Sequence, residues 1–185
     1  LSLELLMPLL GFRHQGPTGR EVPSGVFFDL STWHLIQWRY SPGALRDAQK
    51  LRTDYTDAPL HGRLMQVLNE RLGHRMANTV EQAKIAASTG DADAPMPLDW
   101  IEPGLGAAIT AQGLARCLAQ PLQKVVGCAR ECVQLAGLAP QGLDAIYLTG
   151  GSSALRPLRH ALKAAFPDTP QLEGDLFGGV AAGLA

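Results

Sequence analysis

The sequence predicts an α/β protein, and three observations predict it. Apolar residues in the first half recur at three- and four-residue steps, which is typical of amphipathic helices. Two short apolar runs flank Glu102-Pro103-Gly104, which indicates a β-hairpin. From Gln141 to the end, strand-like and helix-like segments alternate, a pattern typical of a parallel sheet layered with helices.

The composition is that of a folded chain. Its 185 residues are 46% hydrophobic and 18% charged, which supplies a core and excludes a disordered or low-complexity protein. The formal net charge of −1 gives no electrostatic reason to expect nucleic acid or an anionic membrane as a partner. No apolar run approaches the roughly 20 residues of a membrane helix, and no basic stretch precedes Leu1 to Leu10 as in a signal peptide.

The first half is predicted to be helical. Leu1 to Leu10 reads as a short apolar helix, and residues 11–25, rich in Gly and Pro, read as a loop. Helices are predicted at 43–58 and, without a break, at 60–88. The apolar face of the second helix comprises Leu64, Val67, Leu68, Leu72, Met76 and Val80.

The second half is predicted to contain all the strands. Pro97 restricts the first hairpin strand to a sheet edge, because proline lacks the N–H of a ladder hydrogen bond. Thr110 is a suitable N-cap for a helix that runs to about Leu138 and in which Pro121 predicts a kink. The predicted elements are a turn at 89–95, strands at 96–101, 105–109, 144–149 and 171–173, and helices at 155–166 and 177–185.

The aromatic residues of the first half have a structural and a functional interpretation. The aromatic residues between 26 and 45 either form a stacking platform for bases or pack in the core or at a contact between subdomains. We favour packing, because basic residues do not alternate with Phe27, Phe28, Trp33, Trp38 and Tyr40.

The three cysteines all fall in one predicted helix. Cys128 and Cys132 share a helix face, but no further ligand follows at a recognisable spacing. We therefore predict buried thiols, no metal site and a reducing compartment such as the cytoplasm.

A Gly-Gly-Ser turn is the first candidate binding element. Gly150, Gly151 and Ser152 stand between a predicted strand and a predicted helix. Glycines let a ligand approach the backbone, and the following helix presents free N–H groups to phosphate or ribose oxygens. The turn is neither a Walker A loop nor a dinucleotide fingerprint, and many such turns only cap a strand.

The second candidate binding element lies on the long predicted helix. Glu81, Lys84, Ile85 and Ser88 are spaced so that they share one helix face. Glutamate can accept hydrogen bonds from ribose hydroxyls, lysine can donate while its stem lies along a ring, and serine can bind a base edge. The alternative is an ordinary surface Glu–Lys pair.

In this order, the two elements resemble the nucleotide-binding domain of the heat-shock protein 70 (DnaK-like) chaperones. In that family a Glu-x-x-Lys-x-x-x-Ser helix and a Gly-Gly-Ser turn close over the adenosine. The hairpin, the long helix after Ile109-Thr110 and the final Gly179-Val-Ala-Ala-Gly183 match the family's order too. The Met7-Pro8-Leu9-Leu10 segment and the final nine residues look closest to the short YegD-type members, which lack the peptide-binding domain.

The resemblance implies an actin-like (ribonuclease H-like) fold, of which this chain is the C-terminal half of lobe II. It implies residues 1–25 as a linking helix and loop, 26–138 as a subdomain IIB-like part, and 139–185 as the end of subdomain IIA. The ligand would be ATP or ADP, with Mg²⁺ and the catalytic groups in a missing N-terminal half, so this chain has no catalytic residue. Further partners implied are a co-chaperone or nucleotide-exchange factor, and the location is the cytoplasm.

The sequence departs from the family where adenine would be clamped. The family commonly carries arginines where this chain has Ile85 and Ala154, and the acid of its last helix is displaced, with Phe177 there and Asp175 earlier. Arg156 and Arg159 are the nearest candidate substitutes. One alternative is a non-catalytic interaction module that keeps the fold and uses residues 26–40 as its partner surface. Another is a sugar or glycerol kinase of the same superfamily, although those enzymes do not usually carry the Glu-x-x-Lys helix.

Overall fold

A computed structural model describes residues 1–89 and 93–174, and the chain forms a mixed α/β protein of two units. Unit 1 comprises Leu1–Lys84 with Asp93–Thr110, and unit 2 comprises Ile85–Ala92 with Ala111–Ala185. The division into segments 1–25, 26–138 and 139–185 that the resemblance implies stays a prediction.

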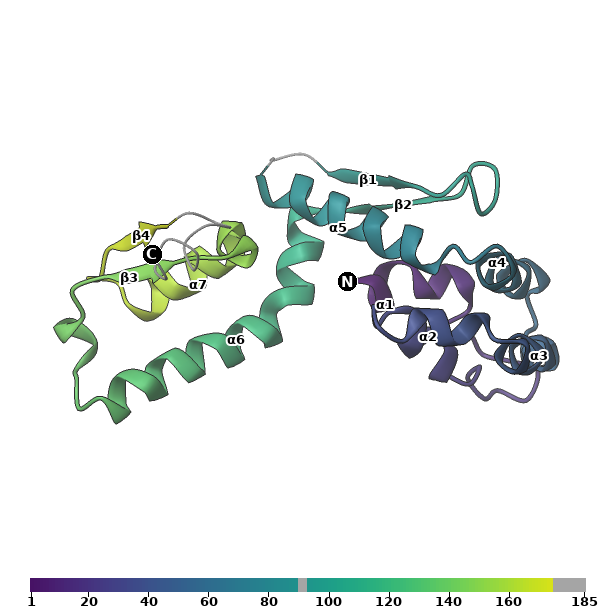
Figure 1. Cartoon of the computed structure of the whole chain (residues 1–185), viewed down its shortest axis with the longest axis horizontal. Coiled ribbons are helices and arrows are strands. Elements are labelled where there is room, and N and C mark those ends of the chain that lie inside the picture. Colours follow the sequence, from purple (N-terminus) through teal and green to yellow (C-terminus); the bar gives the residue numbers. More distant parts are fainter. Residues whose placement is uncertain (90–92, 175–185) are drawn as a thin grey trace. The chain divides into compact units, whose positions relative to one another are not determined.

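Unit 1 is mainly helical (Figure 1). The predicted first helix is α1 (Ser2–Leu5) followed by the 3-10 helix η1 (Met7–Leu10), and the predicted loop follows it. The remaining elements are α2 (Gly25–Leu30), η2 (Ile36–Tyr40), α3 (Pro42–Lys50), η3 (Leu51–Asp54), α4 (Ala58–Asn69), α5 (Gly73–Thr89), β1 (Ala94–Pro97) and β2 (Gly106–Ile109), and α5 continues from Ile85 into unit 2.

The prediction of a single helix at 60–88 is wrong, because the helix is interrupted between α4 and α5. Arg71 adopts a left-handed conformation with φ of 57°, which ends α4. Gly73 then lies so close to η2 that a Cβ would stand 2.6 Å from Ile36 Cγ2, and its N–H donates to the Tyr40 hydroxyl at 2.9 Å. The predicted apolar face is nevertheless buried at Leu64, Val67, Leu68, Met76 and Val80 and half-buried at Leu72.

Side-chain hydrogen bonds join distant segments of unit 1. The buried Tyr55 hydroxyl donates to the Leu10 carbonyl at 2.8 Å, and burial raises the pKa of Tyr55, so this proton is retained. The Arg63 guanidinium on α4 binds both carboxylate oxygens of Glu102, at 2.6 and 2.8 Å. These bonds fix η1 and the hairpin loop to the helices.

The hairpin is confirmed, but its first strand differs from the predicted range of 96–101, since β1 ends at Pro97. Met96 pairs with Ala107, and the Leu98 N–H donates to the Leu105 carbonyl at 2.9 Å. Alternation along an antiparallel ladder therefore directs Pro95 and Pro97 to the outer edge. The edge position predicted from Pro97 is confirmed. Residues 90–92 of the predicted turn lie outside the described residues.

Unit 2 is a small β–α–β layer. The strands β3 (Ile146–Leu148) and β4 (Gln171–Glu173) pair in parallel, in a sheet separate from the hairpin. Between them lie the 3-10 helix η5 (Gly151–Ala154) and α7 (Arg156–Ala165). Leu148, Leu162 and Phe166 form a buried cluster against α6 (Ala111–Leu135). The short 3-10 helix η4 (Pro140–Gly142) precedes β3, and the helix predicted at 177–185 lies outside the described residues.

Helix α6 begins after Thr110, as predicted, and changes direction in its first half, which contains Pro121 (Figure 1). The prediction of buried thiols is wrong for Cys128 and Cys132, which are exposed, while Cys117 is half-buried. Val126, Ala129 and Val133 pack against the core instead. At 100° per residue, Cys132 lies beside that face and Cys128 lies nearer the opposite side of the helix.

No helix within residues 1–89 and 93–174 combines the length and the apolar character that crossing a bilayer requires.

Candidate functional site

The first group of predicted site residues lies on α5. Lys84 Nζ is 2.6 Å from Glu81 Oε2, and the two side chains are 27% and 53% exposed. Such a surface pair contributes little stability, about 0–1 kcal/mol, but it fixes the ammonium group of Lys84 beside a carboxylate. The helix therefore carries a donor and an acceptor at adjacent positions of one face.

The other two α5 residues differ in exposure. Ile85 is 48% exposed, which leaves an apolar surface beside the Glu81–Lys84 pair. Ser88 is 4% exposed, so its hydroxyl is not presented to solvent in this structure. The predicted contact of Ser88 with a base stays a prediction.

The second group is the turn at the carboxyl end of β3. Gly150 has φ 83° and ψ 158°, a backbone conformation essentially restricted to glycine. The Ser153 N–H and Oγ both donate to the Gly150 carbonyl, at 3.0 and 2.7 Å. Among the described residues, no atom lies within 4 Å of the place where a Cβ on Gly150 would stand, and Gly151 and Ser152 are exposed. The described part of the chain therefore leaves this turn accessible to a ligand.

Arg159 holds this turn in place, a role that the sequence did not suggest. Its Nε donates to the Ser153 carbonyl at 2.8 Å, and its guanidinium pairs with Glu173 on β4. This guanidinium is thus used to join the turn to the sheet. The feature of the sequence that could have indicated this role is the position of Arg159 in the first turn of the helix that follows the Gly-Gly-Ser-Ser segment.

The boundary between the units passes through the first group. Glu81 and Lys84 lie in unit 1, whereas Ile85, Ser88 and residues 150–152 lie in unit 2. Within each group the residues are neighbours, as the spacing predicted.

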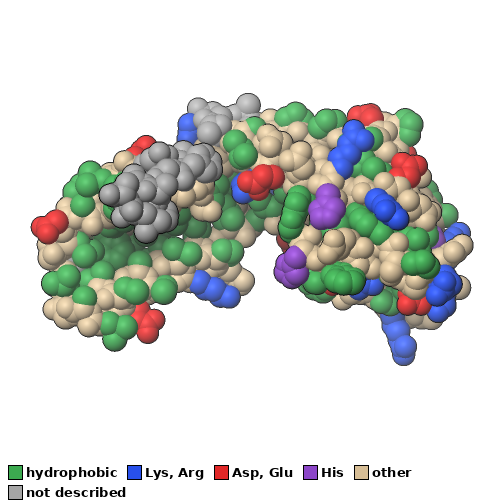
Figure 2. Space-filling model, viewed as in Figure 1, with side chains coloured by type: hydrophobic (Ala, Val, Ile, Leu, Met, Phe, Trp, Pro, Cys, Tyr) green, Lys and Arg blue, Asp and Glu red, His purple; other side chains and the backbone are tan. Residues whose placement is uncertain are grey.

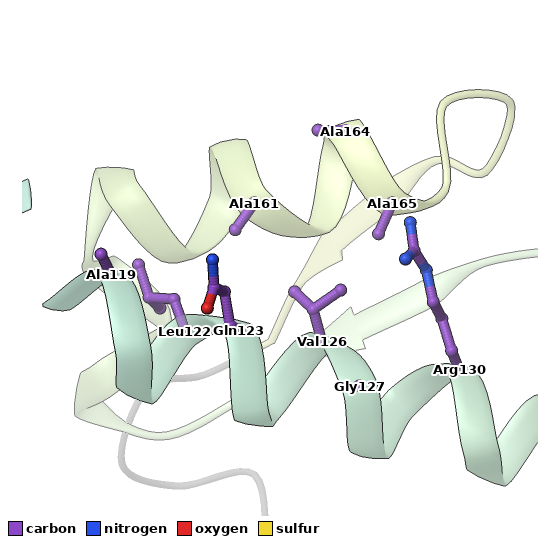
Figure 3. Close-up of a pocket in the computed structure, with 9 residues that line it drawn as sticks. All are labelled: Ala119, Leu122, Gln123, Val126, Gly127, Arg130, Ala161, Ala164 and Ala165. Atoms are coloured by element: carbon purple, nitrogen blue, oxygen red, sulfur yellow. The ribbon is translucent and has the colours of Figure 1, made fainter.

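A groove lies between α6 and α7 inside unit 2, with a volume of about 430 Å³. Leu122, Gln123 and Val126 point from α6 toward α7, and Ala161 and Ala165 point back (Figure 3). Hydrophobic side chains gather along this side of the unit in the space-filling view (Figure 2). The groove shares no lining residue with the predicted site.

The aromatic segment is only partly in the core. Phe27 is fully buried, but Phe28, Trp33 and Trp38 are 48%, 62% and 66% exposed. Packing in the core is therefore confirmed for Phe27 and wrong for these three, while a subdomain contact at Phe28, Trp33 and Trp38 stays a prediction. Trp33 contacts the His74 ring edge-on, with centroids 4.6 Å apart.

Within the described residues, no group of three or more His, Cys, Asp or Glu side chains is arranged to hold a metal ion. No protein-family model matches the chain, and no solved structure matches it.

Proposed function

We propose that this chain is the C-terminal half of the nucleotide-binding domain of a DnaK-like chaperone with an actin-like fold. In this proposal it supplies the adenosine side of an ATP or ADP cleft. Support comes from the sequence resemblance and from the turn at Gly150. Ligands of α/β sheets collect at the carboxyl ends of parallel strands, which is where this turn lies.

The conformation of Gly150 is the observation that carries the proposal. The conformation requires glycine, and the turn lies at the carboxyl end of β3, where ligands of α/β sheets collect. A ribose or phosphate oxygen fits such a place, because it can approach backbone N–H groups without meeting a side chain.

Each site residue has a role in this proposal. Glu81 accepts from ribose hydroxyls, Lys84 donates to them and lays its stem along the base, and Ile85 gives an apolar wall. Gly150, Gly151 and Ser152 contact the sugar and phosphates from the other side, and Ser88 stays assigned to the base edge.

Bound Mg²⁺ would neutralise phosphate charge, and the proposal assigns its ligands and the catalytic groups to the N-terminal half. The full-length protein is then a slow ATPase of the cytoplasm, served by a co-chaperone or nucleotide-exchange factor. This chain alone should show no ATP turnover above that of a buffer blank.

Calorimetric titration of ATP and ADP into the full-length protein, at fixed salt and Mg²⁺, tests the proposal. Lys84→Ala should weaken binding by about tenfold, which is 1.4 kcal/mol, because a donor and a packing surface are lost. Lys163→Ala is the matched control, since Lys163, in the last turn of α7, donates to the Pro167 carbonyl just after that helix and is not one of the proposed site residues. Equal affinities for both variants would contradict the assignment of Lys84.

The alternative is a non-catalytic interaction module, and the exposure of Phe28, Trp33 and Trp38 favours it, since exposed tryptophans often anchor protein interfaces. Under this alternative the full-length protein binds no nucleotide. Two intact phosphate loops upstream would favour the ATPase, and their loss would favour the module.

A further inference from the structure

A second apolar face runs along α6, separate from the face that packs on α7. Its residues recur at alternating steps of four and three, at Leu114, Leu118, Pro121, Val125, Cys128, Cys132 and Leu135. This heptad spacing is typical of a helix that pairs with another helix along one side. The last four residues, Val125, Cys128, Cys132 and Leu135, lie in the straight second half of the helix and are called the α6 seam below (Figure 1).

The α6 seam is exposed although all its residues are apolar. Val125 and Leu135 are 49% and 81% exposed, and the two cysteines are exposed as well. At 100° per residue, the seam lies about 110° around the helix from Val126, Ala129 and Val133, which pack against the core of unit 2. The described part of unit 2 therefore does not use the seam for its own packing. Cysteine is among the most often buried residue types, so exposed thiols in an apolar row indicate a surface that another helix covers.

Two opposite charges border the seam on the flank turned away from the core of unit 2. Lys124 and Glu131 are both exposed and stand seven residues apart, on the same flank. When two copies of the helix pair antiparallel about a two-fold axis, this flank of one copy lies beside the same flank of the other in reverse order, so Lys124 of each copy meets Glu131 of the other. In a parallel pair the flank would instead lie beside Ala129 and Ala136, which carry no charge. The charges therefore favour a second, antiparallel copy.

We infer that the α6 seam pairs antiparallel with the seam of a second copy of this chain, and that two Lys124–Glu131 ion pairs border the buried apolar row of this homodimer. In this register Val125 lies opposite Cys128 of the second copy. The inference goes beyond the proposed function and does not depend on it, since it uses only α6. Two heptads form an interface of the small class, below about 1,200 Å², so we expect a dissociation constant of about 10–100 μM.

Sedimentation equilibrium of the full-length protein tests the inference, and the mass should rise from monomer to dimer over that concentration range. Lys124→Glu should weaken the dimer at least about tenfold, because both ion pairs become repulsive. Adding Glu131→Lys to this variant should restore the dissociation constant to within about threefold of the wild-type value, since each pair then forms with its charges exchanged. Arg130→Glu is the matched control, because it reverses an exposed charge on the side of α6 opposite the seam, and it should change the constant by less than about threefold.

Three outcomes of this measurement would overturn the inference. The first is a monomeric mass throughout the concentration range. The second is a double variant that dimerises as weakly as Lys124→Glu alone, since the charges would then not meet across the pair. The third is a dimer of the 185-residue chain together with a monomeric full-length protein, because the remaining polypeptide would then cover the seam.

Cysteine crosslinking tests the register. Val125→Cys places a thiol opposite Cys128 of the second copy, so oxidation by copper phenanthroline should give a covalent dimer at least about tenfold faster than for the control Gln123→Cys, because pairing raises the effective concentration of the two thiols. Gln123 is exposed and lies far from the seam on the same helix. Equal crosslinking rates for the two variants would overturn the inferred register.

Discussion

Replacing Gly150 by alanine should destabilise unit 2 through backbone strain alone. A new Cβ meets no atom of the described residues within 4 Å, so the substitution creates no steric clash with them. The φ of 83° and ψ of 158° are nearly inaccessible to alanine, and holding a residue in such a region costs about 1–3 kcal/mol. In a chain of this size that corresponds to a melting temperature lower by about 2–12 °C.

Gly127→Ala is the matched control for this substitution, with the opposite expected sign. Gly127 lies in α6 of the same unit, and a Cβ there also meets nothing within 4 Å. Alanine favours the helix, so this variant should be more stable by about 0.5–1 kcal/mol.

Two spectroscopic signals separate the units in this experiment. All three tryptophans, Trp33, Trp38 and Trp100, lie in unit 1, whereas far-UV circular dichroism also reports the helices of unit 2. Gly150→Ala should move the circular dichroism transition in urea to lower concentration and leave the tryptophan transition in place. An unchanged circular dichroism transition, or a shift in the same direction as that of Gly127→Ala, would refute the strain argument.

Three further predictions concern the ion pair at the hairpin, the helix break and the adenine site. Arg63 holds the pKa of Glu102 below its usual value near 4.5, so the pair stabilises the fold above that pH and is lost as pH falls through the folded pKa. Glu102→Gln should thus be less stable than wild type in urea at pH 7 but not at pH 2. Asp47→Asn, which removes an ion pair at an exposed site, should change the stability little at either pH. A difference in stability between Glu102→Gln and wild type that persists at pH 2 would contradict this prediction. Arg71→Gly should raise the free energy of unfolding by about 0.5–1 kcal/mol by relieving the left-handed conformation, and a decrease would contradict that. The double substitution Ile85→Arg with Ala154→Arg should tighten ATP binding to the full-length protein at least tenfold, because each stacking guanidinium contributes about 0.5–2 kcal/mol. An unchanged dissociation constant would show that adenine does not lie between positions 85 and 154.

Local patterns in the sequence predicted the positions of the strands and of helices α1, α6 and α7, but not helix α2, and the helix predicted at 43–58 is α3 followed by η3, which ends at Asp54. The strand at Gln171–Glu173, the hairpin and the start of α6 after Thr110 follow from alternation, turn residues and capping, which are properties of neighbouring residues. The break at Arg71 was missed because the apolar face continues across it. Its cause is the contact of Gly73 with Ile36 and Tyr40, which are more than thirty positions earlier in the chain.

The candidate site was predictable as two motifs but not as a set of contacts. Spacing placed Glu81 and Lys84 on one face of α5, and the pair forms as expected. The same spacing could not show that Ser88 is buried, because burial depends on what packs against the helix. The sequence indicates Arg159 only as a substitute for the family's adenine-binding arginines. Its contacts with Ser153 and Glu173 could not be predicted, because these residues come together only when the β–α–β layer folds.

The two units differ in how they are stabilised, and the difference agrees with their proposed roles. Unit 1 combines fully buried side chains such as Phe27, Leu64 and Met76 with the buried hydrogen bond from Tyr55. Unit 2 holds its glycine turn by the Ser153 and Arg159 hydrogen bonds over a small apolar cluster. Segments that bind and release ligands are drawn from the less stable parts of proteins. Under the proposed function, the N-terminal half of the domain would stabilise this turn further. Nucleotide binding by the 185-residue chain should therefore be weaker than that of the full-length protein, even where every contacting residue of this half is intact.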